Sequence, residues 1–206
     1  MQQVLGAVPA ASVADAAVLT REFVIADMLG PASLAYLDPA DFRPAPGQAA
    51  GAGLDTSSPA LRRFLAEADT ADLAESGIAE ITSPAFVIRD EDRIIAAAGY
   101  RDWPGQVAHL SVLTAVHGRA RGLGGAAASA AVMHALAENK MPEWRARPEA
   151  SRRIARRLGF RELGAQVSIR LAGTSSPAVL LADLPTYWLT CRAQERWPSC
   201  SRTQRP

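Results

Sequence analysis

The residue types best suited to bind a ligand lie in one turn, residues 118–125, which read GRARGLGG. Glycine tolerates positive φ and lets a ligand approach the backbone closely, so consecutive N–H groups can point at phosphate oxygens. The guanidinium groups of Arg119 and Arg121 add positive charge beside those N–H groups. The turn therefore predicts a binding site for a ligand that carries a diphosphate.

Two flanking segments must hold this turn in place. Residues 109–116 are rich in apolar and β-branched side chains, as in a buried strand. Residues 123–136 contain so much alanine that they favour a helix. The turn then leads from the end of a strand to the start of a helix, where the positive end of the helix dipole stabilises an anion.

Residues 122–127 also fit G-x-G-x-x-A, the pattern of dinucleotide-binding folds. That motif belongs to a parallel strand–helix–strand unit, whereas short turns before residue 109 indicate antiparallel hairpins. No Gly-Lys-Ser or Gly-Lys-Thr follows, which excludes a P-loop. We therefore expect neither of these nucleotide-binding folds.

The strands before the turn are joined by connections too short for a parallel arrangement. Strands are predicted at residues 84–89 and 93–101, and parallel neighbours would need a crossover of about a dozen residues. With residues 109–116 they form an antiparallel meander. Further helices are predicted at residues 12–28, 57–68, 71–77 and 149–158, strands at 32–37, 142–147, 160–163 and 166–171, and a linker at 38–53.

Composition limits the partners of the chain. Its 206 residues, 49% of them hydrophobic, are enough for one core, and the net charge of +1 argues against nucleic acid as an obligate partner. The apolar first residues, 1–19, lack the basic segment of a signal peptide and are interrupted by Pro9 and Asp15. Cys191 and Cys200 match no metal-ligand spacing, so no metal site is expected. These features favour a soluble, cytoplasmic protein without a membrane partner.

Residues 119–124, RARGLG, resemble the R/Q-x-x-G-x-G/A signature of the GNAT superfamily, the acyl-CoA-dependent N-acyltransferases. Residues 112–114 stand where that family has the strand before its signature, and residues 154–160, IARRLGF, resemble its A-x-x-L-G-F segment. The resemblance covers about residues 57–171. It implies the α+β fold class, with a mixed, mostly antiparallel twisted sheet flanked by helices.

The resemblance also implies that acetyl-CoA is the cosubstrate. Its pantetheine arm would pair with the backbone of Val112, Leu113 and Thr114, between two strands that splay apart. A backbone N–H of the strand that contains Val112, Leu113 and Thr114 would polarise the acyl carbonyl. The pyrophosphate would be held by the backbone of the signature turn, that is Arg119, Ala120, Arg121, Gly122, Leu123, Gly124 and Gly125.

The sequence departs from the family at the usual acid and base positions. Pro148 stands where members often have an asparagine, and Ala155 where a tyrosine commonly serves as general acid. Ala108 occupies the position of the carboxylate that some members use as a base. The acid and base must therefore come from other residues or from water.

Three polar residues are the remaining catalytic candidates. His109 is predicted beside the acyl site and can serve as a base, because its unperturbed pKa lies near neutrality. Ser151 can donate to the leaving sulfur, and Glu75 can bind or deprotonate an amine. Each also has a structural alternative. His109 can be a buried hydrogen-bonded imidazole, Ser151 a helix cap or a packing contact, and Glu75 a solvent-exposed carboxylate.

We therefore expect an N-acetyltransferase that moves acetyl from acetyl-CoA directly to a primary amine of a small molecule or peptide. Direct attack is favoured because neither cysteine lies near the predicted site. The alternative is a catalytically inactive CoA-binding protein with a regulatory or interaction role. The predicted organisation is an N-terminal extension or subdomain at 1–53, the transferase domain at 54–172 and a C-terminal tail at 173–206. The sequence does not decide the oligomeric state, and a homodimer is possible.

Overall fold

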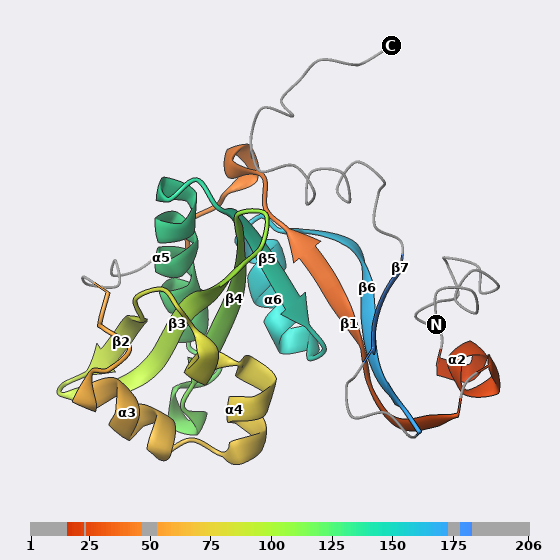
Figure 1. The fold of residues 1–206 in the computed structure, drawn as a ribbon. Coiled ribbons are helices and arrows are strands. Elements are labelled where there is room, and N and C mark those ends of the chain that lie inside the picture. The colour runs from red at the N-terminus through yellow and green to blue at the C-terminus, as the bar shows by residue number, and fades with distance from the viewer. Residues whose placement is uncertain (1–15, 23, 47–52, 173–177, 183–206) are drawn as a thin grey trace, which may run out of the picture.

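Seven strands form one sheet in the computed structural model, which describes residues 16–22, 24–46, 53–172 and 178–182. Their order is β2-β3-β4-β5-β1-β6-β7 (Figure 1). The strands are β1 (Ile25–Tyr36), β2 (Phe86–Asp90), β3 (Arg93–Trp103), β4 (Val107–Thr114), β5 (Met141–Ala146), β6 (Arg161–Leu171) and β7 (Ala178–Ala182). The helices are α2 (Ala16–Glu22), α3 (Pro59–Ala66), α4 (Thr70–Ser76), α5 (Leu123–Ala137) and α6 (Glu149–Arg157), with short 3-10 turns η2 (Pro39–Asp41), η3 (Ile78–Glu80) and η4 (Val116–Gly118).

The predicted mixed, mostly antiparallel sheet flanked by helices is confirmed. Strands β2, β3 and β4 form the antiparallel meander that their short connections require. Strand β1 lies between β5 and β6 and is antiparallel to both, and β7 is antiparallel to β6. Among the described residues, β4 and β5 are the parallel pair, because the crossover helix α5 separates them in the chain.

Helices cover both faces of the sheet (Figure 1). On one face α5 and α6 pack through a core that includes Leu110 of β4 and Trp144 of β5. On the other face, α3 and η3 pack on Leu113 of β4. Leu110 and Leu113 point to opposite faces because side chains alternate along a strand. Small alanine side chains make up most of the buried surface of α5, so that its backbone lies close to the sheet.

The N-terminal elements differ from their prediction. The helix predicted at residues 12–28 is the shorter α2, and residues 12–15 and 23 lie outside the described part. Strand β1 begins at Ile25 rather than at residue 32, because it pairs with β6 as far as Ile25–Leu171. Pairing with a distant strand thus decided the conformation of a segment whose local pattern suggested a helix.

The C-terminal strands also differ from their prediction. Residues 160–163 and 166–171 were expected to be two strands separated at Gly164, but β6 is continuous. Gly164 pairs with Leu34 of β1, so it lies within the sheet and not in a turn. Because β1 and β7 belong to this sheet, the predicted limits at residues 53 and 172 do not coincide with the limits of the sheet. Cys191 and Cys200 lie outside the described residues.

The described part of the predicted linker at 38–53 packs on the domain. Its first residues form η2. The N–H of Arg43 donates to the carbonyl of Leu158 at 3.0 Å, and the N–H of Ala45 donates to Ser129 Oγ at 3.1 Å. These contacts attach the segment after β1 to the ends of α6 and the middle of α5. Residues 47–52 lie outside the described part.

Candidate functional site

Strands β4 and β5 separate halfway along β4. Their parallel ladder contains three register pairs, Val107–Met141, Ala108–Pro142 and His109–Glu143, and no later pair among the described residues. The other edge of β4 stays paired with β3 as far as Thr114. The edge of β4 that faces β5 is therefore open from residue 110 to residue 114, which includes Val112, Leu113 and Thr114 of the predicted cosubstrate site. An amide-bearing ligand can add to such an edge as a strand does.

The signature turn follows this open edge directly. Ala120 and Gly122 both have left-handed backbones, with φ of 62° and 79°. Gly122 is the N-cap of α5, and no side chain of the described residues caps this helix. A Cβ at Gly122 would meet nothing within 4 Å, so open space lies beside the backbone there. The first N–H groups of an α-helix have no partner within the helix, and the start of α5 has no side-chain cap, so an anion is a suitable partner for them.

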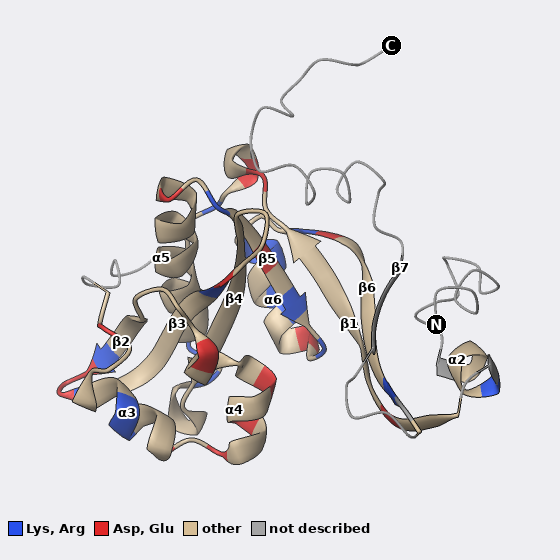
Figure 2. Ribbon diagram, viewed as in Figure 1, with Lys and Arg blue, Asp and Glu red and all other residues tan. Residues whose placement is uncertain are grey.

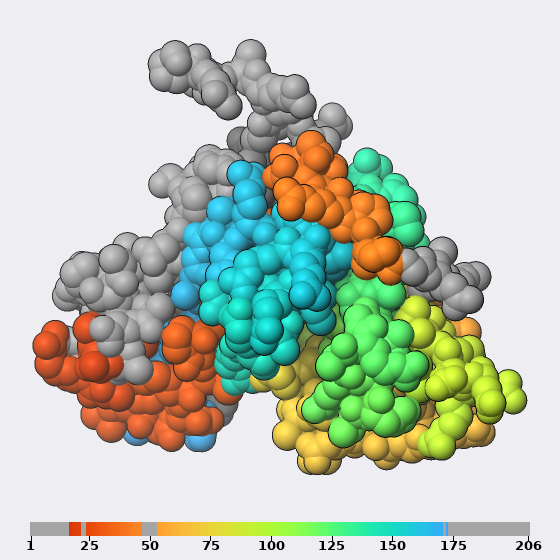
Figure 3. Space-filling view, turned by 180° about the vertical axis from the view of Figure 1, so that it is seen from behind, coloured from red at the N-terminus to blue at the C-terminus, as the bar shows by residue number. Residues whose placement is uncertain are grey.

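Gly124 has a packing role in the same turn. A Cβ there would lie 2.7 Å from Thr114 Oγ1, which is closer than side chains tolerate. The absence of a side chain lets the start of α5 lie against the end of β4. Figure 3 shows the side of the molecule on which the turn (green) and α6 (cyan) are neighbours, and Ile154 of α6 lies 3.7 Å from the position of that Cβ.

The two arginines of the turn have different surroundings. The Arg119 guanidinium bonds Asp72 Oδ2 of α4 at 2.5 Å and the carbonyl of Thr114 at 3.4 Å. Its charge is therefore already partnered, and the side chain ties the turn to α4. Arg121 is exposed and has no ion pair within the described residues. Arg121 is the guanidinium that remains available to a phosphate.

His109 lies at the point where the strands separate. Its ring stacks on Trp103 with centroids 4.3 Å apart and an interplanar angle of 8°. Its register partner on β5 is Glu143, whose exposed fraction is 1%. Both side chains point to the face of α3 and α4, because they alternate with Leu110 and Trp144. Glu143 is therefore a buried titratable group at this site, and the family motifs did not indicate it.

Glu75 lies on α4 and forms a two-point ion pair with Arg147, which follows β5. Arg147 Nε lies 3.3 Å from Glu75 Oε1, and Arg147 Nη2 donates to Oε2. Helix α4, whose acidic residues are red in Figure 2, is also attached to β4, since Gly77 packs on Ser111. The structure thus brings Glu75 to the side where β4 and β5 separate, as expected of a residue of the acceptor site, but with its carboxylate already bound by an arginine.

Ser151 has a structural partner. Its Oγ accepts a hydrogen bond from Trp144 Nε1 at 3.0 Å, which holds the indole of β5 against α6. This contact is the packing alternative considered for Ser151. The hydroxyl proton is not used in that bond, so the group keeps a donor.

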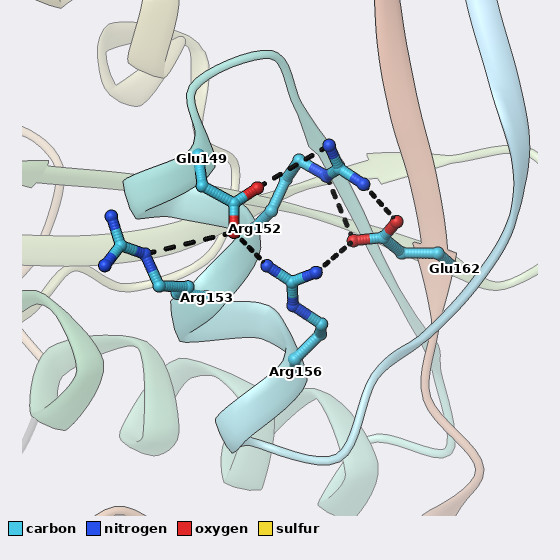
Figure 4. Close-up of polar contacts among 5 residues, drawn as sticks. All are labelled: Glu149, Arg152, Arg153, Arg156 and Glu162. Carbon is cyan, nitrogen blue, oxygen red and sulfur yellow. Dashed lines mark hydrogen bonds and ion pairs between the residues drawn. The ribbon is translucent and has the colours of Figure 1, made fainter.

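The arginines of α6 form an ion-pair network on its exposed side (Figure 4). Arg152 binds Glu162 at two points, with distances of 3.0 Å and 2.6 Å. This pairing lowers the pKa of the Glu162 carboxyl and raises the pKa of Arg152. The other members of the network are Arg153, Arg156 and Glu149. The exposed side of α6 is therefore a set of paired charges.

A hollow of about 60 Å³ opens on the face of α4, beside the end of β5. It is lined by Leu29, Ala32, Ala74, Glu75, Arg145, Ala146, Arg147, Gln166 and Ser168. Trp144 and Ala146 pack under α5 and α6, so Arg145 between them points to the opposite face. The signature turn and this hollow thus lie on opposite faces of the sheet, on the two sides of the place where the β4–β5 ladder ends.

An open strand edge beside the start of a helix is the arrangement that the sequence predicted for a ligand with a diphosphate and an amide-bearing arm. Residues 83–165 match the family model of the GNAT acetyltransferases. The matched range extends from the residues before β2 into β6 and contains both the open edge and the signature turn. This part of the chain is therefore similar to a GNAT acetyltransferase domain.

Solved structures of this family have the same fold. A GNAT-family protein from Novosphingobium aromaticivorans DSM 12444 is 19% identical, with a TM-score of 0.55 over 78% of this chain and 67% of that one. A GCN5-related N-acetyltransferase from Kribbella flavida is 20% identical, with a TM-score of 0.50 over 75% of this chain and 62% of that one. This chain therefore spans about two thirds of their length. No curated protein matches it significantly.

No helix of the described residues is long and apolar enough to cross a membrane. No group of three or more His, Cys, Asp and Glu side chains within the same residues is arranged to hold a metal ion.

Proposed function

We propose that the chain transfers the acetyl group of acetyl-CoA to a primary amine of a small molecule or peptide. The observation that carries this proposal is the end of the β4–β5 ladder at His109–Glu143, together with the start of α5 after β4, which has no side-chain cap. A thin arm that carries amides fits the open strand edge, and a diphosphate fits the helix start. The thioester of acetyl-CoA supplies an activated acyl group.

The residues that would hold acetyl-CoA have separate tasks. The open edge of β4, at Val112, Leu113 and Thr114, would pair with the arm. The N–H groups from Ala120 to Gly125 would bind the diphosphate, since the N–H of Arg119 already donates to the carbonyl of Val116 at 3.3 Å. The side chain of Arg121 would add a charge-assisted hydrogen bond. The side chain of Arg119 would hold the turn in position through Asp72.

The transfer needs an unprotonated amine close to the acyl carbonyl. The amine nitrogen attacks the carbonyl carbon, the carbon–sulfur bond breaks, and the sulfur leaves as the CoA thiolate. The proton that the amine releases would pass through a base of the protein to this thiolate. A β4 backbone N–H would stabilise the oxyanion. His109 and Glu143 are the titratable groups at the point where the strands separate, and we propose them as the base that accepts the amine proton. Positioning would supply most of the rate enhancement.

A second candidate function is CoA binding without catalysis. It is favoured by Ala155, which is buried in the core and stands where the family commonly has a tyrosine acid. It is also favoured by Pro148, which stands where members of the family often have an asparagine. Both functions use the same turn and strand edge, and they differ only in whether the thioester is consumed.

The full chain tests both candidates in two measurements. Calorimetry with acetyl-CoA measures binding, and release of free thiol in the presence of a panel of primary amines measures transfer. The proposal predicts binding and amine-dependent thiol release. Binding without release would favour the second candidate, and absence of binding to well-folded protein would overturn both.

A further inference from the structure

We propose that the hollow beside the end of β5 receives an acceptor that carries a carboxylate next to its amine, as an α-amino acid does. This inference rests on the proposed function, because it names the acceptor of that reaction. The hollow lies on the α4 face, and its β5 residues begin two positions after Glu143, where the strands separate. An acceptor held there is next to the gap through which a thioester on the β4 edge would be reached.

The charge of the lining carries the argument. Arg147 is neutralised by Glu75 through two contacts. Arg145 also lines the hollow, and no carboxylate of the described residues pairs with it. The charged side chains of the hollow, Glu75, Arg145 and Arg147, therefore carry a net charge of one positive unit. A guanidinium presents donors in a fork that matches a carboxylate, so the ligand that Arg145 fits best is an anion of this shape.

Two polar side chains of β6 add hydrogen-bonding groups to the same hollow. Gln166 has an exposed fraction of 6%, and its Nε2 lies 3.5 Å from Ser168 Oγ. A buried amide is costly unless its groups are satisfied, and this long contact uses only one of its two N–H donors. The second N–H of Gln166 and the hydroxyl of Ser168 are suited to the carboxylate oxygens of an acceptor.

Glu75 supplies the complementary group for the amine. Two arginine contacts leave lone pairs on its carboxylate, so it can still accept a hydrogen bond from an ammonium or amine. The hollow of about 60 Å³ has room for a few water molecules, each of which needs roughly 10–15 Å³ by the same measure. That volume fits a carboxylate and its neighbouring carbon, and not a folded protein segment. A small zwitterion therefore matches the lining in charge and in size.

The test compares acceptors that differ in the carboxylate alone. The full chain and acetyl-CoA are incubated with the common α-amino acids, with their amides, and with the amines that lack the carboxyl group, while free thiol is followed. The amides have a less basic amine and the decarboxylated series a more basic one, so amine basicity cannot produce a preference for the amino acids over both. The proposal predicts faster release with at least one amino acid than with its two partners.

A substitution of Arg145 tests whether this side chain causes the preference for the amino acid. Arg145→Gln is expected to raise the KM for the preferred amino acid tenfold or more, because it removes a charge-assisted contact, and to leave the KM for acetyl-CoA unchanged. Arg62→Gln is the matched control, since Arg62 is an exposed arginine of α3, away from the hollow. Circular dichroism spectra would show that both variants are folded.

The outcomes separate this inference from the proposed function. Release with amines that lack a carboxylate, at the same or a greater rate, keeps the acetyltransferase and overturns the inference. An unchanged KM for the amino acid in folded Arg145→Gln also overturns it. Absence of release with every amine, although acetyl-CoA binds, counts against the inference and the transfer reaction together.

Discussion

Glu75 of α4 and Arg147 after β5 bind each other across the side on which β4 and β5 separate. Arg147 Nε lies 3.3 Å from Glu75 Oε1, and a second bond joins Arg147 Nη2 to Oε2. Because α4 is attached to β4 by the contact of Gly77 with Ser111, this ion pair connects two strands that have stopped pairing.

The ion pair is expected to contribute to stability in a double-mutant cycle of Glu75→Gln and Arg147→Gln. Both side chains are about one third exposed, so solvent screens the attraction. We predict a coupling of about 0.5–1 kcal/mol in the free energy of unfolding, measured by urea denaturation. The coupling should decrease in high salt. Strictly additive effects of the two substitutions would contradict a stabilising pair.

Substitution of Gly122 tests the anion site at the start of α5. Asp and Asn both tolerate the left-handed backbone of Gly122, so Gly122→Asp and Gly122→Asn share the conformational cost. The aspartate adds a negative charge where the diphosphate is proposed to bind. We predict that calorimetry at low salt gives a Kd for CoA at least tenfold higher in Gly122→Asp than in Gly122→Asn. Equal Kd values in the two folded variants would mean that no anion binds there.

The two arginines of the turn should separate into a ligand contact and a structural contact. Arg121→Gln is expected to weaken CoA binding about three- to tenfold, with a smaller effect in high salt, since a phosphate contact at the surface is screened. Arg119→Gln loses the bond to Asp72 and should lower the free energy of unfolding by about 0.5–1 kcal/mol. Calorimetry and urea denaturation measure the two effects. An unchanged Kd in Arg121→Gln would show that its side chain does not contact the ligand.

Glu162 makes stability depend on pH in the acid range. Its hydrogen bonds from Arg152 lower the pKa of the carboxyl below its usual value of 4.5. A carboxyl whose folded-state pKa is lowered stabilises the fold above its unfolded pKa, and this stabilisation disappears as the pH falls through the folded pKa. Glu162→Gln should therefore cost up to about 1 kcal/mol at pH 7 and much less at pH 3.

Urea denaturation of the wild-type protein and Glu162→Gln at the two pH values measures this difference. Glu91→Gln, in the exposed turn between β2 and β3, is the control, because Glu91 has no ion pair within the described residues. A cost for Glu162→Gln that stays constant between pH 7 and pH 3 would contradict the pairing with Arg152.

Local patterns predicted most of the fold. The short connections of β2, β3 and β4 dictated their antiparallel order, and the alanine-rich stretch dictated α5. The extent of β1 and the continuity of β6 through Gly164 were not predictable in this way, because each depends on the other strand as its partner. A glycine that local rules assign to a turn is here held in a strand by the backbone of Leu34.

The candidate site was predictable where it is one continuous segment. The turn of Arg121 and Gly122 could be found from glycine and arginine spacing. Glu143, Arg145 and Arg147 were missed, because they come close to β4 and α4 only through the parallel crossover of α5. A signal for Glu143 existed in the sequence, since a carboxylate between a proline and a tryptophan in an apolar strand needs a polar partner or a function.

The central claim is that the open edge of β4 and the start of α5 together bind one CoA molecule. A crystal structure of the full chain with CoA tests it most directly. The account predicts diphosphate oxygens within hydrogen-bonding distance of N–H groups between Arg119 and Gly125, and the pantetheine arm along Val112–Thr114. CoA bound elsewhere on the folded protein, with β4 and β5 still open beyond His109–Glu143, would contradict it.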